Sequence, residues 1–336
     1  MTDSPEPKRR ILVIGGAGYV GSVLARILLD SGHGVRVMDS FLYNNTFSIE
    51  SLYEEPGFGF VKGDIRRPAD IELALEGVND VVLLASLVGD PISRKYPELT
   101  WEINYQGSIN VFQALAAADI DRFVFTSTCS NYGLRPSEAF ATEDAQLKPL
   151  SLYAESKVDF ENYILENAAA VDFCPTILRI ATAYGLSPRM RFDLTIADFT
   201  RKLAMGRSLT VYDKDTWRPY CHVRDIARAI LQVLQAPLAR VRGEVFNVGC
   251  NDENYTKATI VDLITRHVNA EVRYKENDVD PRNYRVSFDK IATTLGFRTD
   301  HAVPTHIPTL IEALRSGLYA RAEEMSSYYG NHEIAE

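Results

Sequence analysis

Short apolar runs alternate with longer amphipathic stretches along the first half of the chain. The short runs predict β-strands at Ile11–Gly15, Val35–Asp39, Phe58–Val61, Asp80–Ala85, Arg122–Ser127 and Thr176–Ile180. Apolar positions at helical spacing predict helices over Tyr19–Asp30, Ala69–Glu76, Leu99–Ala118 and Leu152–Ala170. Strands that alternate with helices imply βαβ units and a parallel sheet, and nearly uniformly apolar strands indicate that helices cover both faces. The sequence therefore predicts an α/β fold with a doubly wound parallel sheet.

The pattern changes after Ile180. One helix is predicted over Leu194–Met205, in a stretch rich in Arg, Asp and Pro. A helix over Val223–Gln235 and a strand over Glu244–Val248 then lead back to the sheet.

This pattern predicts two interleaved units. Residues 9–180, with a return segment at about 222–250, form the sheet domain. Residues 181–221 and 251–320 form a smaller α/β lobe for substrate. Residues 1–8 and 321–336 are expected to be solvated tails.

Composition limits the kinds of partner. The 336 residues are 46% hydrophobic and 24% charged, as in an ordinary globular protein, and the net charge is −9. This charge argues against nucleic acid or an anionic membrane as a partner. An anionic ligand must therefore be bound by local basic residues and helix N-termini.

The cysteines and histidines give no sign of a metal. Cys129, Cys174, Cys221 and Cys250 lie far apart without CxxC spacing, and the six histidines show no HxxxH or HExxH. We expect reduced thiols and no metal site. The N-terminus lacks the apolar stretch of a signal peptide and no stretch has transmembrane length, so a cytoplasmic location is expected.

A glycine-rich turn follows the first predicted strand. Gly15, Gly18 and Gly21 have GxxGxxG spacing, which is related to the dinucleotide fingerprint GxGxxG. Such a turn lets the backbone approach a pyrophosphate, which then lies on unpaired N–H groups at the positive end of a helix dipole. Gly15, Gly18, Tyr19 and Val20 are therefore candidate cofactor-binding residues.

Acids at the ends of the next two strands extend this prediction. Asp39 follows Gly21 by eighteen residues, close to the ~20 expected for a ribose-binding acid. A carboxylate there accepts hydrogen bonds from the adenosine ribose and repels a 2′-phosphate, so NAD is favoured over NADP. Asp64, after the third strand, is placed to reach the adenine, although alone it would indicate only an exposed loop acid.

Tyr153 and Lys157 stand four residues apart, on one face of a predicted helix. A nearby ammonium and a cationic nicotinamide lower the pKa of a tyrosine. Such a tyrosine can remove a hydroxyl proton while hydride leaves the same carbon. On its own, this spacing indicates no more than a solvated helix face.

Further residues connect these motifs. They include Asn104, Thr128, Leu84-Ala85-Ser86, Leu178-Arg179, Tyr184-Gly185 and the segment from Arg218 to Asp225. With them the chain resembles, from about Ile11 to Leu318, the extended short-chain dehydrogenase/reductase family. More narrowly, it resembles the nucleotide-sugar epimerase/dehydratase branch, of the UDP-glucose 4-epimerase type. The resemblance implies a Rossmann-type fold and an NAD-dependent enzyme.

The resemblance also implies catalytic and cofactor-binding roles. Tyr153 would be the acid/base on the sugar hydroxyl, Lys157 would bind the nicotinamide ribose and lower the pKa of Tyr153, and Thr128 would hydrogen-bond the same sugar oxygen. The cofactor site would comprise Gly15, Gly18, Tyr19, Val20, Asp39, Asp64, Ile65, Leu84, Ala85, Ser86, Asn104, Tyr153 and Lys157.

The implied substrate is a nucleotide diphosphate sugar. Arg218 matches the family arginine that holds the diphosphate, and Thr182 stands where many 4-epimerases have an asparagine. Arg282 and Arg285 are either a second contact or an ordinary surface pair. The basic stretch from Ser187 to Asp193 gives either further anion contacts or a solvated loop. The candidate substrate-binding residues are Thr128, Thr182, Arg191, Arg218, Arg282 and Arg285.

Two positions after Thr128 depart from the family pattern. Family dehydratases have an Asp-Glu pair there and decarboxylases a Glu, whereas this chain has Cys129 and Ser130. Epimerases that work beside a ketone often have Cys at the place of Ser130. Cys129 is therefore either an acid/base or inert packing.

The leading interpretation is an NAD-dependent epimerase that oxidises the sugar C4 transiently and returns hydride to the opposite face. A 4-ketoreductase or 4-dehydrogenase would use the same residues with net turnover of NAD(P). A non-catalytic NAD-sensing regulator is the alternative from another class, although such proteins usually lose the Tyr/Lys pair. Relatives commonly dimerise through the helices around 99–118 and 152–170, so a homodimer is expected.

Overall fold

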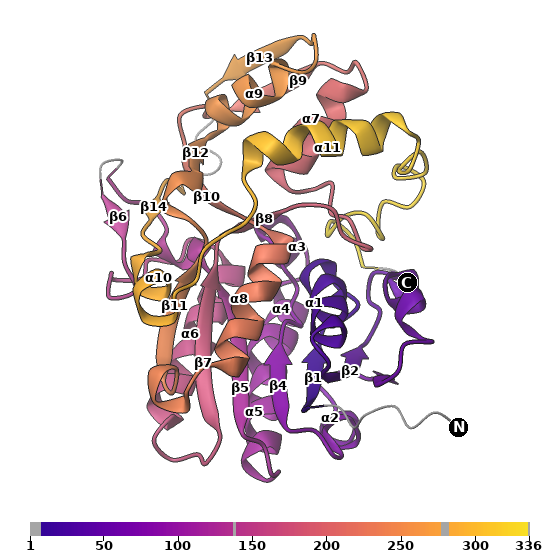
Figure 1. Ribbon diagram of the computed structural model, residues 1–336. Coiled ribbons are helices and arrows are strands. Elements are labelled where there is room, and N and C mark those ends of the chain that lie inside the picture. The colour runs from indigo at the N-terminus through magenta and orange to yellow at the C-terminus, as the bar shows by residue number, and fades with distance from the viewer. Residues whose placement is uncertain (1–7, 137–138, 277–281, 335–336) are drawn as a thin grey trace.

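A seven-stranded parallel sheet forms the centre of the protein, seen in a computed structural model that describes residues 8–136, 139–276 and 282–334 (Figure 1). Its order is β3-β2-β1-β4-β5-β7-β11. The strands are β1 (Arg10–Ile14), β2 (Gly34–Asp39), β3 (Phe58–Lys62), β4 (Asp80–Leu83), β5 (Arg122–Thr128), β7 (Cys174–Ile180) and β11 (Glu244–Val248). The direction of winding reverses between β1 and β4, so the predicted doubly wound, Rossmann-type sheet is confirmed.

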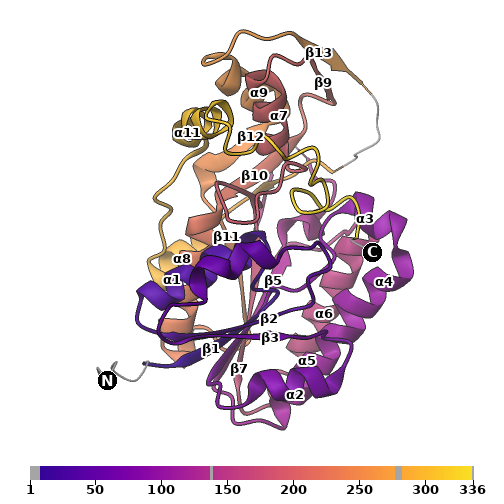
Figure 2. The ribbon, with the colours of Figure 1, turned by 90° about the vertical axis from the view of Figure 1, so that its right-hand side faces the viewer.

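Helices cover both faces of this sheet (Figure 2). Ile11 and Val13 of β1 belong to the core on one face, and Leu12 and Ile14 belong to the core on the other, because successive strand residues point to opposite faces. The first face is covered by α1 (Tyr19–Asp30) and α8 (Val223–Gln235), and the second by α2 (Pro68–Leu75), α5 (Ser108–Ala116) and α6 (Leu152–Asn167).

The helix predicted over Leu99–Ala118 is present, but it is not regular throughout. It consists of α4 (Pro97–Trp101), a π-helical turn over Glu102–Gly107 and α5 in succession. Such turns place backbone and side chains where a regular helix does not, and this one directs Asn104 toward the loop after β4.

A smaller lobe lies beyond the carboxyl ends of the strands (Figure 1). Its sheets are β8 (Thr182–Tyr184), β10 (Trp217–His222) and β12 (Asn254–Thr256), and the pair β9 (Leu209–Tyr212) with β13 (Val272–Lys275). Its helices are α7 (Thr195–Ala204), α9 (Lys257–Thr265) and α11 (Val303–Arg315). Short helical turns occur at η1 (Thr46–Leu52), α3 (Asp90–Lys95), η3 (Cys129–Tyr132), η4 (Leu238–Arg240) and η5 (Asn251–Glu253).

The two units interleave more than the sequence predicts. β6 (Phe140–Ala141), from the first half of the chain, pairs with β14 (Arg285–Val286). Conversely, α10 (Asp289–Leu295) lies inside the predicted substrate lobe but packs against β11, where Lys290 Nζ is 2.7 Å from Glu244 Oε2. The boundaries predicted for the second lobe therefore do not hold for α10.

The predicted tail 321–336 is also wrong over its described part. Tyr328 and Asn331 are buried, and the phenol of Tyr328 donates a 2.7 Å hydrogen bond to the carbonyl of Pro188. Burial of aromatic surface explains why this segment packs instead of remaining solvated. Of the predicted N-terminal tail 1–8, residues 1–7 lie outside the described residues. No helix in the described ranges is long and apolar enough to cross a membrane.

A buried ion pair connects α6 to the sheet. Arg179 of β7 donates to both carboxylate oxygens of Glu161 on α6, at 2.7–3.2 Å, and both side chains are nearly inaccessible. Asn131 donates to Glu161 at 2.8 Å, and Arg179 also donates to the phenol of Tyr132 at 3.1 Å. These bonds satisfy the charges away from water, so they fix the position of α6 on the sheet.

We predict that Glu161→Ala lowers the free energy of unfolding by about 3–5 kcal/mol, because Arg179 remains buried without its counter-charge. Urea unfolding followed by circular dichroism measures the loss. Glu166→Ala, the same substitution at an exposed position of the same helix, is the control and should cost no more than about 0.5 kcal/mol. Equal losses in the two variants would contradict a structural role for the pair.

Candidate active site

A cavity of about 430 Å³ lies at the carboxyl ends of the strands, where the sheet reverses its winding. This is the place where open α/β sheets bind ligands. Residues from β1, β5, the loop after β4 and the smaller lobe line it, including Ile14, Thr126, Leu84 and Thr195. It brings together the glycine turn, the Tyr/Lys motif and most of the predicted arginines.

The glycine turn forms one wall of this cavity. Gly15 has a positive φ of 83°, and a Cβ on Gly21 would lie 2.4 Å from the carbonyl oxygen of Gly15. Gly18 is the N-cap residue of α1 and has no side chain that could cap the first N–H groups of the helix. Tyr19 and Val20 of the first helical turn line the cavity. The turn therefore presents a helix N-terminus without covering side chains, which fits a pyrophosphate.

Asp39 also lines the cavity. Its carboxylate accepts hydrogen bonds from the backbone N–H groups of Ala17, at 3.0 Å, and Phe41, at 2.9 Å. Burial raises the pKa of Asp39, and these two donors oppose the rise. Each oxygen keeps a lone pair, so the carboxylate can accept a hydrogen bond from a ribose.

The other predicted cofactor residues divide into two groups. Asp64, Ile65, Leu84, Ala85 and Ser86 line the cavity, and Arg66 holds the Asp64 carboxylate at 2.6–3.1 Å. Asn104 is completely buried and outside the lining. Its amide instead bonds the N–H of Leu87 at 2.8 Å and the carbonyl of Leu87 at 3.1 Å. Asn104 thus supports the cofactor side of the cavity from behind its wall, by holding the loop that lines it.

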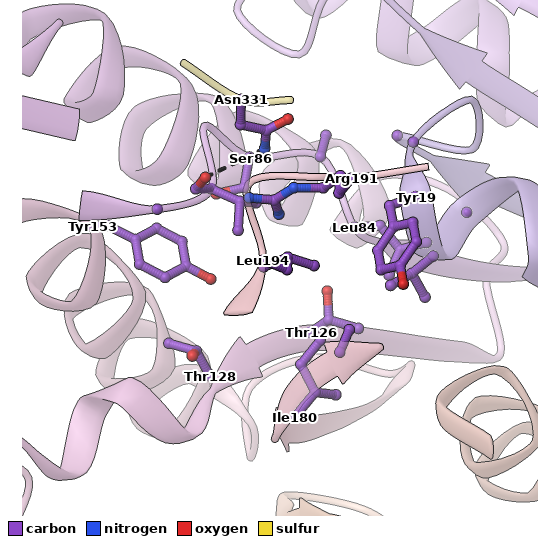
Figure 3. A pocket seen from close by; sticks show the side chains of 18 of the residues that line it. Tyr19, Leu84, Ser86, Thr126, Thr128, Tyr153, Ile180, Arg191, Leu194 and Asn331 are labelled. Atoms are coloured by element: carbon purple, nitrogen blue, oxygen red, sulfur yellow. Dashed lines mark hydrogen bonds between the residues drawn. The ribbon is translucent and has the colours of Figure 1, made fainter. Parts of the chain in front are cut away.

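Tyr153 and Thr128 meet at this cavity from different elements, α6 and β5. Figure 3 shows the phenol and the hydroxyl pointing into the same space, with Arg191 above them. Burial raises the pKa of Tyr153 to about 12, while a hydrogen bond with Thr128 and the charge of Arg191 lower it. In the protein without ligand, Tyr153 is therefore a neutral phenol poised beside a cation.

Lys157 lies one turn further along α6. Its ammonium donates to the carbonyl of Thr126 at 3.0 Å and lies 4.7 Å from the ring centre of Phe125. Burial lowers the pKa of Lys157 to about 7. Lys157 thus lines the cavity together with Tyr153, but its charge is easily lost.

The substrate candidates converge at the cavity, with one exception. Thr182, Arg191, Arg218 and Arg282 line it. Arg191 pairs with the Asp193 carboxylate, and Arg282 pairs with Asp90 at 3.0 Å. Arg218 packs over the ring of Tyr284 at 5.2 Å.

Arg285 is the exception. Its guanidinium lies over the rings of Phe140, at 4.4 Å, and Trp217, at 5.0 Å, and it is outside the cavity lining. Successive residues of an extended segment point in opposite directions, so Tyr284 faces the cavity and Arg285 faces away. Arg285 is therefore placed away from the predicted substrate contact, and it packs on Trp217, which also lies outside the cavity lining.

Cys129 and Ser130 occupy different environments. Cys129 is buried, its thiol donates to the carbonyl of Arg179 at 3.3 Å, and burial raises its pKa well above the ordinary value. Ser130 lines the cavity, and its hydroxyl lies 3.3 Å from that of Tyr284. Cys129 is therefore packing, and the acid/base interpretation is not supported.

Several residues that line the cavity were not predicted from the sequence to contact a ligand: Tyr43, Asn45, Asp90, Arg189, Lys257, Tyr284, Asn331 and His332. The basic stretch around Arg189 was the only signal. The others are ordinary residues in loops, and only tertiary structure brings them to the cavity.

Comparisons with known proteins agree with this geometry. The sequence profile described as the NAD dependent epimerase/dehydratase family matches residues 11–249. A UDP-glucose 4-epimerase of Corynebacterium glutamicum is 30% identical over 322 residues, which cover 90% of this chain and 94% of that protein.

Solved structures share the fold. DesIV, a dTDP-glucose 4,6-dehydratase of Streptomyces venezuelae solved with NAD, superposes with a TM-score of 0.84 at 26% identity, covering 94% of this chain and 99% of that one. A UDP-glucose 4-epimerase of Thermotoga maritima solved with UDP-glucose gives a TM-score of 0.82 at 25% identity, covering 92% of this chain and 99% of that one.

We predict that Lys157→Met stabilises the cofactor-free protein near pH 7. The pKa of Lys157 is about 7 when folded and about 10.4 when unfolded. Between these values the unfolded chain binds a proton that the folded chain lacks, so wild-type stability rises with pH. The variant removes this dependence, so its advantage of a few kcal/mol (about 1.4 per unit) should shrink toward about pH 10.

Urea unfolding at a series of pH values measures the difference. Lys62→Met, on the exposed side of β3, is the matched control and should show no such trend. A difference between wild type and Lys157→Met that stays constant with pH would contradict the lowered pKa.

Proposed function

We propose that this chain, which belongs to the NAD-dependent epimerase/dehydratase family, is an epimerase of a nucleotide diphosphate sugar. The observation that carries the proposal is the meeting of the Tyr153 phenol and the Thr128 hydroxyl in the cavity that also contains the glycine turn. A relative named UDP-glucose 4-epimerase, similar over 90% of this chain, supports the same class of reaction.

In the proposed reaction, Tyr153 accepts the proton of the sugar C4 hydroxyl and Thr128 hydrogen-bonds the same oxygen. The glycine turn and Asp39 would hold NAD, which would supply a reversible hydride acceptor for C4, so that no cofactor would be consumed. The phenol needs a lower pKa than the value of about 12 in the ligand-free protein. Arg191 already favours the phenolate, and a protonated Lys157, one turn further along the same helix, would add to this effect. Tyr153 then returns its proton when the ketone is reduced from the other face.

The arginines at the far end of the cavity are the proposed diphosphate site. Arg218 and Arg282 lie next to each other, because Arg218 donates a 2.5 Å hydrogen bond to the carbonyl of Arg282. Two guanidinium groups supply the donors and the charge that a diphosphate requires. With the diphosphate at these arginines and the cofactor at the glycine turn, the sugar would lie between the two, next to Tyr153.

The environment after Thr128 favours epimerisation over elimination. Neither Cys129 nor Ser130 is an acid, and the Ser130 hydroxyl faces the neutral phenol of Tyr284. Elimination needs a base that removes a second proton from the sugar ring, and these two positions supply no carboxylate for that role. Reversible oxidation at C4 is the simplest chemistry that remains.

The same residues would serve a 4-ketoreductase or 4-dehydrogenase with net turnover of NAD(P). Incubation of the purified protein with NAD and a panel of nucleotide sugars separates these functions. A new epimer without accumulating NADH supports the proposal. NADH that accumulates in step with a keto sugar would replace the epimerase by a dehydrogenase, and bound NAD without any turnover would indicate a sensor.

We predict that Tyr153→Phe lowers the rate of epimerisation by about 10²–10⁴-fold, because the proton acceptor is lost. Binding of NAD, measured by calorimetry, should be retained. Tyr163→Phe, the same change further along α6 and outside the cavity lining, is the control and should keep the wild-type rate. Full turnover by Tyr153→Phe would remove Tyr153 from the mechanism.

We further propose a homodimer through α4 and α6, and a cytoplasmic location. Trp101 and Leu165, on these two contacting helices, are each 41% exposed, so this face offers apolar surface that a partner subunit would bury. The location rests on the four cysteines, which are all unpaired, three of them buried.

The dimer is tested with Trp101→Glu. A charge on this face should shift the chain from dimer to monomer in sedimentation analysis, with an unchanged circular dichroism spectrum. Phe47→Glu, an equally drastic change at an exposed site in η1, should leave the association unaltered. A monomeric wild-type protein would refute the assembly and leave the proposed reaction intact.

A further inference from the structure

The chain returns to the cavity after its last helix. We call residues 319–334 the C-terminal strap (Figure 2). The strap packs on the loop between β8 and α7: the N–H of Phe192 donates to the carbonyl of Tyr329 at 2.8 Å, and the rings of Tyr319 and Tyr329 lie 5.1 and 5.9 Å from that of Phe192. These contacts place the end of the strap over the cavity, where Asn331 and His332 line it.

Asn331 connects two loops that face each other. Its carbonyl oxygen accepts a 2.7 Å hydrogen bond from Arg189, in the loop between β8 and α7. Its amide donates to the carbonyl of Val88, in the loop after β4, at 3.2 Å. Arg189 also donates to the carbonyl of Gly330 at 3.2 Å. The strap therefore bridges the cavity, and Asn331 is buried within the bridge, with an exposed fraction of 5%.

Arg189 is a buried cation that has no carboxylate partner among the residues that the structure describes. Its exposed fraction is 2%, and within the described residues it forms hydrogen bonds only to carbonyl and amide oxygens. Its Nε is buried without a hydrogen-bond partner in that part of the chain. Arg191, by contrast, is paired with Asp193. A buried, unpaired charge is costly, so the site of Arg189 is incomplete until an anion enters the cavity.

The position of Arg189 identifies the kind of anion. Its guanidinium lies 4.5 Å from the ring centre of Tyr43, and its charge lowers the pKa of the Asp39 carboxylate. Tyr43, Asp39 and the glycine turn line the same end of the cavity. Arg189 therefore faces the end that suits a dinucleotide, opposite the helix N-terminus that suits its phosphates.

We infer that the C-terminal strap is part of the cofactor site: Asn331 positions Arg189 as a counter-charge for the phosphates of NAD and closes the cavity over the cofactor. This inference rests on the cofactor of the proposed function. It makes Asn331 a positioning residue and makes NAD a resident group, which leaves only when the strap detaches from Val88 and Arg189.

The rate of NAD⁺ release, measured without any sugar, tests the strap. Protein loaded with radiolabelled NAD⁺ is diluted into an excess of unlabelled NAD⁺. Asn331→Ala should accelerate release by about 10–100-fold, the effect expected for loss of a hydrogen bond to a charged group. Glu312→Gln, at an exposed position of α11 before the strap begins, is the control and should release NAD⁺ at the wild-type rate. Tyr328→Phe removes only the hydrogen bond to Pro188 and should give a smaller acceleration.

The role of Arg189 is tested with two ligands. Arg189→Gln should weaken the binding of ADP-ribose, which carries the phosphates, and leave the binding of adenosine unchanged. Equal weakening of both ligands would overturn the phosphate contact. Wild-type release rates in Asn331→Ala and Tyr328→Phe, with unaltered melting temperatures, would overturn the strap. A wild-type protein that retains NAD⁺ but forms no epimer would refute the proposed function alone.

Discussion

The buried pair of Glu161 and Arg179 is the interaction on which the site depends. It joins α6, which carries Tyr153 and Lys157, to β7, and through Asn131 to the turn that follows Thr128. A helix packed only by apolar contacts can slide or rotate at modest cost, whereas a bidentate guanidinium–carboxylate pair has one favoured geometry. The pair therefore fixes the phenol of Tyr153 relative to the hydroxyl of Thr128. Such buried charges add little net stability, and we attribute their value here to position.

The cationic side chains that line the cavity differ in the kind of partner that holds them. Arg191 and Arg282 have carboxylate partners in Asp193 and Asp90, whereas Lys157 and Arg189 have only neutral oxygen partners among the described residues. The paired cations are held in place before any ligand arrives. Lys157 and Arg189 lose part of the stability of their charged forms through burial, and their pKa values fall to about 7 and about 10. Anionic and electron-rich groups of a ligand restore that stability, so binding and charge are coupled.

The sequence predicted features that follow from local pattern. The ends of α1, α8 and β11 agree with the predictions, because each combines a clear apolar period with a boundary residue. The glycine turn, Asp39 and the Tyr153 motif were found because their chemistry requires particular residues at fixed spacing.

Features that depend on tertiary contacts were missed or misassigned. The π-helical turn that contains Asn104 has no periodic signal, and the way Asn104 supports the Leu87 loop is visible only in three dimensions. Arg285 resembled Arg282 in sequence, yet the alternation of an extended backbone turns it toward Trp217. The strap has the composition of a tail, and only the aromatic surface of Phe192 gives it a place to pack. The pairing of β6 with β14 has a consequence for biosynthesis, since these strands are separated by more than a third of the chain. The edge strand β11 and the residues that close the cavity also emerge late from the ribosome. The nascent chain therefore exposes the unpaired backbone edge of β7 until β11 has been synthesised, and it is most prone to pair with other chains during that interval.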